Sequence, residues 1–77
     1  MSTRLTQLDY HVMIVSISET IRRDIRNGYP GFAAVQGLTL QKILPRVKDT
    51  EDIRRITDVL AECETAHRKH CASIAQA

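Results

Sequence analysis

The chain has 77 residues, a formal net charge of +2, and 43% hydrophobic residues of which few are aromatic. This length predicts one domain, residues 1–77, that buries only about 60% of the surface its unfolded chain exposes, so the core must be thin and aliphatic. The weak positive charge does not indicate a nucleic-acid partner, for which a strongly basic face is expected.

The first predicted element is a helix over residues 7–26. Thr6 is placed to cap it, with Asp9 three residues later in a short version of the capping box. Apolar residues recur at helical spacing on two adjacent stripes, which together are wider than one partner helix would cover. The stripes are Tyr10, Ile14, Ile17, Ile21, Ile25 and Leu8, Val12, Val15. Asn27-Gly28 is typical of a helix end.

The middle of the chain, residues 28–49, is broken by glycines and prolines and predicts two short helices, around 32–36 and 39–44. Within 33–44, Ala33, Gly37 and Ile43 outline a partial helix-turn-helix. The motif departs from the usual pattern because Pro45 would fall in its recognition helix. We expect a plain packing unit of two short helices here, with DNA recognition through this segment as the alternative.

The last segment predicts a helix from Thr50 to about Ala75, capped by Asp49. Its inner positions follow spacings of three and four residues, the pattern of a heptad seam. They are Ile53, Ile56, Leu60, Cys63, His67, His70 and Ile74. A helix this long spans about 39 Å, more than a small globule needs. The seam therefore predicts pairing with a second copy, as a homodimer.

These elements together predict an all-α fold. We expect a small helical bundle in which two long helices pack antiparallel, with one or two short helices between them, and which forms a dimer.

The residues most able to bind a metal or act as a nucleophile are Cys63, His67, His70 and Cys71. Cys63/His67 and His67/Cys71 are pairs spaced four apart, which can grip a soft metal. A closed site would need ligands from another segment, and only His11 lies elsewhere. Core or seam packing is therefore favoured, with no metal and no cofactor. Nothing supplies an oxyanion hole for a nucleophilic cysteine, so we expect no enzyme activity.

A contact surface is predicted where the first helix ends and the turn begins. Arg22, Arg23 and Arg26 are followed by Tyr29 and Phe32. Arginine and tyrosine are enriched at the energetic centres of interfaces, and loops on a rigid scaffold often carry binding residues. The alternative is a solvated basic helix end that complements the helix dipole. We expect these five residues to bind a partner.

The size and the lack of catalytic chemistry predict a non-enzymatic regulatory protein that occupies a surface on a larger protein partner. Anti-activators and phage-encoded inhibitors such as anti-CRISPR proteins are of this kind, although no motif indicates them. The alternative is a small nucleic-acid-binding regulator that uses residues 33–44 or the Arg22/Arg23/Arg26 patch.

The sequence also predicts a compartment. On one helix, Cys63 and Cys71 would lie about 12 Å apart, beyond disulfide reach, and free thiols fit a reducing environment. The longest apolar run, Val12–Val15, is too short for a signal peptide or a membrane span. We therefore expect a cytoplasmic protein with no membrane contact.

Overall fold

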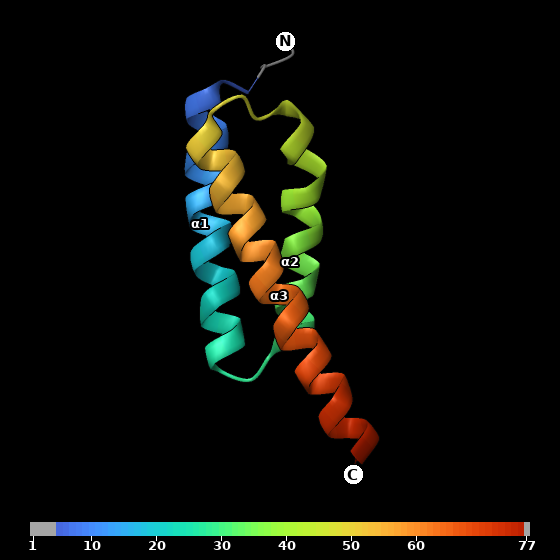
Figure 1. Cartoon of the computed structure of the whole chain (residues 1–77). Coiled ribbons are helices and arrows are strands. Elements are labelled where there is room, and N and C mark those ends of the chain that lie inside the picture. The colour runs from blue at the N-terminus through green and yellow to red at the C-terminus, as the bar shows by residue number, and fades with distance from the viewer. Residues whose placement is uncertain (1–4, 77) are drawn as a thin grey trace.

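A computed structural model describes residues 5–76, with the backbone alone for residues 75 and 76. The three α-helices are α1 (Gln7–Arg26), α2 (Pro30–Ile43) and α3 (Thr50–Gln76), and a 3-10 helix, η1 (Leu44–Arg46), follows α2. Figure 1 shows a bundle in which the chain runs along α1, back along α2 and forward again along α3. The described residues contain no strand, so the all-α prediction is confirmed.

The two long helices run in the same direction, and α2 runs opposite to both (Figure 1). His11 near the start of α1 pairs with Asp52 near the start of α3, and Arg22 farther along α1 pairs with Glu62 farther along α3. This register corrects the antiparallel packing expected from the sequence. The reason is that the middle segment forms one helix, long enough to carry the chain back to the level where α1 begins.

The start of α1 follows the sequence prediction residue by residue. The Asp9 backbone N–H donates to Thr6 Oγ1 over 3.2 Å, and the Thr6 backbone N–H donates to Asp9 Oδ2 over 2.8 Å. The Thr6 backbone N–H and the Thr6 hydroxyl, which donates to the same carboxylate oxygen over 3.0 Å, lower the pKa of the Asp9 carboxyl from its ordinary value. After Arg26 the chain turns at Gly28, whose φ of +83° is in the left-handed region that favours glycine. The predicted bounds of this helix are confirmed.

The middle segment differs from the prediction of two short helices, because α2 is continuous through Gly37. This glycine marks a close approach of α3, not a turn: a Cβ at Gly37 would lie 3.3 Å from Leu60 Cδ2. Nearby, the Cys63 thiol donates to the Ala33 carbonyl oxygen over 3.5 Å. The partial helix-turn-helix of residues 33–44 is therefore not formed, because its turn lies inside a helix.

The core is aliphatic, as expected, and lies between the three helices. Its buried hydrophobic residues are Tyr10, Ile14, Ile21, Ala33, Leu40, Val47, Ile56, Val59 and Cys63. The first apolar stripe of α1 supplies three of them. The second stripe is outside the core, since Leu8 is 70% and Val12 59% exposed. Among residues 5–76 no further helix is left to cover that side of α1.

The α3 helix begins as predicted, with Asp49 Oδ1 accepting from the backbone N–H groups of Glu51 and Asp52 over 2.8 and 3.4 Å. Figure 1 shows its C-terminal part projecting past the end of the bundle, and residues 67–74 are all exposed. The chain measures 52 × 26 × 17 Å along its principal axes. No helix in the described part of the chain has the length and apolar character needed to cross a membrane.

Candidate functional site

A groove of about 1180 Å³ lies between the C-terminal half of α1 and the middle of α3. Small side chains and charged side chains line it, together with Ile25. The small ones are Ser16, Thr20, Ala61, Thr65 and Ala66, and the charged ones are Glu19, Arg22, Arg23, Arg26, Glu62 and Lys69. All three arginines of the predicted contact surface therefore line one groove, and Lys69 of α3 joins them.

The charges in this α1–α3 groove are not all balanced. Arg22 Nε lies 3.0 Å from Glu62 Oε2, and the two side chains are 47% and 49% exposed. A pair this exposed contributes little to stability, but it ties the two walls together. Arg23, Arg26 and Lys69 have no ion-pair partner among residues 5–76. Glu19 has no ion-pair partner there either, so the groove presents three unpaired cations and one unpaired carboxylate.

The two aromatic residues of the predicted surface lie apart from this groove. Tyr29 precedes α2 and Phe32 lies in its first turn, with ring centroids 5.8 Å apart in an edge-to-face arrangement. They are 53% and 65% exposed, and neither lines the α1–α3 groove. Val35 and Leu38 continue the exposed apolar surface along α2. The structure therefore divides the predicted contact surface into a basic groove and an apolar face of α2.

The cysteines and histidines of α3 differ in burial: Cys63 is buried, whereas His67, His70 and Cys71 are exposed. Cys63 is buried, and this burial, with a smaller effect from Glu62, raises the pKa of its thiol. Cys71 and His67 are exposed, with Sγ 3.9 Å from the ring nitrogens. Within residues 5–76, no three potential ligands are placed to hold one metal ion. Cys63 therefore has a packing role in the core, against α2.

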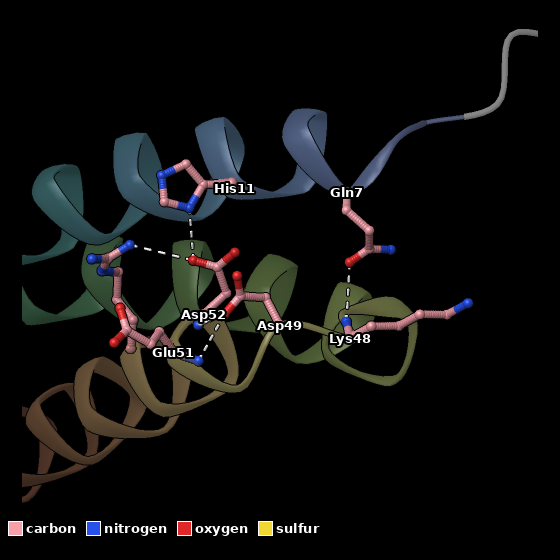
Figure 2. A network of polar contacts seen from close by, with 7 residues as sticks. Gln7, His11, Lys48, Asp49, Glu51 and Asp52 are labelled. Atoms are coloured by element: carbon pink, nitrogen blue, oxygen red, sulfur yellow. Dashed lines mark hydrogen bonds and ion pairs between the residues drawn. The ribbon is translucent and has the colours of Figure 1, made fainter.

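A buried carboxylate fastens α3 to α1. Figure 2 shows His11 pointing to Asp52, with His11 Nδ1 2.8 Å from Asp52 Oδ1. Arg55 Nη1 lies 3.3 Å from the same oxygen. The Asp52 side chain is 4% exposed, whereas that of His11 is 46% exposed. Because a buried charge without partners is costly, these two contacts are what permit Asp52 to lie in the interface.

Gln7 makes a second connection at the same end of the bundle. Its Nε2 donates to the Arg46 carbonyl oxygen over 3.2 Å, and its Oε1 accepts from the Lys48 backbone N–H over 3.0 Å. Figure 2 shows the second of these bonds beside the Asp49 cap. The Gln7 amide thus hydrogen-bonds two backbone groups in the connection between α2 and α3, and this positions the start of α3 relative to α1.

Sequence reasoning missed the His11–Asp52 contact. A signal for half of it was present, because Asp52 lies four residues before Ile56 and so shares the buried face of α3. A carboxylate on such a face needs a partner. The partner itself could not be identified without knowing that α1 and α3 run in the same direction.

Comparisons were made with protein-family models, with curated proteins and with solved structures, and the chain has no significant match in any of them.

Proposed function

We propose that this chain is a non-enzymatic binding protein that acts by occupying a surface on a larger protein partner, as anti-activators and phage-type inhibitors do. Its working surface is the end of the bundle formed by Arg22, Arg23, Arg26, Tyr29 and Phe32. Cytoplasmic location belongs to the same proposal.

The observation that carries this proposal is the apolar outer face of α2. Helices at the surface of a small domain usually bury one face and solvate the other. In α2 the inner face, with Ala33 and Leu40, is buried, yet Phe32, Val35 and Leu38 on the remaining surface are each more than half exposed. Apolar residues that form a contiguous exposed patch often mark an interaction site. The Tyr29 and Phe32 rings, in contact with each other at the start of this face, are of the aromatic type that is enriched in protein interfaces.

Affinity capture from cells that express the protein tests the proposal. The Tyr29→Ala, Phe32→Ala variant should lose the partner that the wild type retains, by more than about thirtyfold in affinity, because truncating such anchors costs more than about 1 kcal/mol each. The Leu8→Ala, Val12→Ala variant is the matched control, since it removes exposed apolar side chains from α1 instead. Equal capture by both variants would contradict the proposed surface.

Nucleic-acid binding is a second candidate, and the basic groove is the observation that favours it. Arg22, Arg23, Arg26 and Lys69 are concentrated along one groove although the whole chain carries only +2. Residues 33–44 no longer support it, because they form one helix. Binding to phosphates would weaken steeply as salt is raised, which a gel-shift titration measures directly.

We also propose a homodimer, which part of the α3 seam supports. Ile56 and Cys63 are buried within the chain itself, and Ile53 and Leu60 pack partly against the same core. The positions left for a second copy are His67, His70 and Ile74, beyond the end of the bundle. These three continue the heptad spacing and are exposed in the single chain.

Sedimentation equilibrium over a range of concentrations measures this association. The wild type should show a mass above one chain, and Ile74→Asp should be monomeric with unchanged helix content, because a charge buried in the pairing surface is costly. Val12→Asp places the same charge on an exposed apolar position of α1 and should leave the dimer intact. A monomeric wild type would remove the dimer from the proposal.

A further inference from the structure

From the α1–α3 groove we infer the kind of segment that the partner presents: an acidic amphipathic helix that lies in the groove between Ser16–Arg26 of α1 and Ala61–Lys69 of α3. This inference rests on the proposed function, since it specifies how the larger protein partner is held. Its evidence is separate from the apolar face of α2 and consists of the shape of the groove and the charges on its walls.

The shape favours a helix. Two neighbouring helices that run in the same direction leave between them a channel that a third helix can fill, with axes 8–10 Å apart when the contacting side chains are small. Ser16, Ala61 and Ala66 are such side chains, and all three line the groove. From Ser16 to Arg26 the α1 wall is about 15 Å long, which accommodates about three turns of a bound helix.

The charges select an acidic occupant. Arg23 and Arg26 lie on the α1 wall and Lys69 on the α3 wall, and none of them pairs with a carboxylate among the described residues. Glu19 on the α1 wall is unpaired as well, so three unpaired cations and one unpaired carboxylate leave an excess of two positive charges. A helix with acidic residues on both flanks and small apolar residues between them would reach cations on both walls. The Arg22–Glu62 pair already joins the walls, so docking needs no rearrangement of the bundle.

Duplex nucleic acid makes a different use of the same cations. Phosphates of a duplex would contact the rims of the groove without entering it, because a duplex is far wider than one helix. The small residues in the groove would then be irrelevant, and affinity would depend on charge alone. A substitution that fills the groove without changing its charge therefore separates a bound helix from a bound duplex.

Fluorescence anisotropy with the full chain provides the test. The probe is a labelled helical peptide with Glu on two flanks and Ala and Leu between them, and its matched control carries Gln in place of Glu. The wild type should bind the acidic peptide and not the Gln peptide. Arg23→Glu with Arg26→Glu should weaken binding about tenfold or more, since the two reversals remove two attractive contacts and add two repulsions against the acidic flanks. Lys42→Glu with Lys48→Glu makes the same change of four charge units at exposed positions outside the groove and should leave binding unchanged within about twofold.

Ser16→Trp should also weaken the acidic peptide about tenfold, because the indole occupies the groove while every charge remains. Thermal unfolding confirms that each variant is folded. If Ser16→Trp does not fold, Thr65→Trp takes its place, since Thr65 is exposed, lines the opposite wall and leaves every charge unchanged. No binding by the wild type, equal binding of the Gln peptide, or wild-type affinity in the variants would overturn the inference. Binding of a duplex that depends on the arginines but not on Ser16 would assign the groove to nucleic acid.

The same variants keep this inference distinct from the proposed function. A captured protein partner that is lost with Tyr29→Ala, Phe32→Ala but retained by Arg23→Glu, Arg26→Glu would leave the aromatic part of the proposed surface in place and remove the arginines, and the groove with them, from that surface. The reverse pattern would assign recognition to the groove and contradict the aromatic surface.

Discussion

Replacing Ile56 with alanine is expected to lower the free energy of unfolding by about 2–5 kcal/mol, which is the cost of a cavity left by a large buried aliphatic residue. Ile56 is fully buried in the N-terminal third of α3, among the residues of the core. A core of this size supplies only about 3–5 kcal/mol of net stability. The variant should therefore be largely unfolded at room temperature, as urea denaturation followed by circular dichroism would show.

Ile74→Ala is the matched control for this substitution. Ile74 lies eighteen residues after Ile56, or about five turns, and so shares its face of α3. It lies beyond the end of the bundle and is 62% exposed. In dilute solution Ile74→Ala should change the free energy of unfolding by no more than about 0.5 kcal/mol. Similar losses in both variants would contradict the separation of α3 into a bundled part and a projecting part.

The comparison of Ile56 with Ile74 also shows how far a heptad pattern can be interpreted. The seven seam positions follow one spacing from Ile53 to Ile74, and sequence alone treats them as equivalent. In the structure the seam positions up to Cys63 are buried or partly buried, and those after it are exposed. The reason is that α3 is longer than α1 and α2, which end before it does. The two short helices that the sequence predicts for the middle segment would give a shorter second element than the continuous α2. The periodicity therefore predicts which face of a helix is apolar, but not what covers it.

Local signals were interpreted most accurately. The bounds of α1 follow from a capping box and from a glycine that adopts a positive φ, and both involve residues within a few positions of each other. The candidate site was predicted only in part. Arg22, Arg23 and Arg26 do share a groove, but Lys69 joins them from another helix and Tyr29 does not line it. Neighbours that come from distant segments depend on the direction of packing, which local signals do not contain.

Gly37 is the residue at which a local signal was interpreted wrongly. Glycine is a poor helix former and often marks a turn, which led to the prediction of a break in the middle segment. Its backbone is helical. Of the three glycines, Gly37 is the one at which an added Cβ would contact atoms of α3. The absence of a side chain is the reason for its presence, because Leu60 Cδ2 would lie 3.3 Å from a Cβ there.

Gly37→Leu is accordingly expected to destabilise the protein although leucine is the better helix former. Glycine in a helix costs roughly 1 kcal/mol relative to good helix formers, so the substitution gains about that amount in propensity. A side chain forced between α2 and α3 would displace Leu60 and the Cys63–Ala33 contact. Overpacking of this kind costs about 1–3 kcal/mol for a few added methylenes, and a whole leucine at a helix–helix contact lies at the upper end or beyond.

Gly31→Leu makes the same exchange near the start of α2, where no atom lies within 4 Å of the added Cβ. This variant should unfold at the wild-type temperature or slightly above it, since the reduced freedom of the unfolded chain contributes up to about 1 kcal/mol. The thermal midpoints of the two variants should therefore move in opposite directions from that of the wild type. If Gly37→Leu were as stable as Gly31→Leu, the helices would not be in contact at Gly37, and the direct packing of α2 on α3 would be wrong.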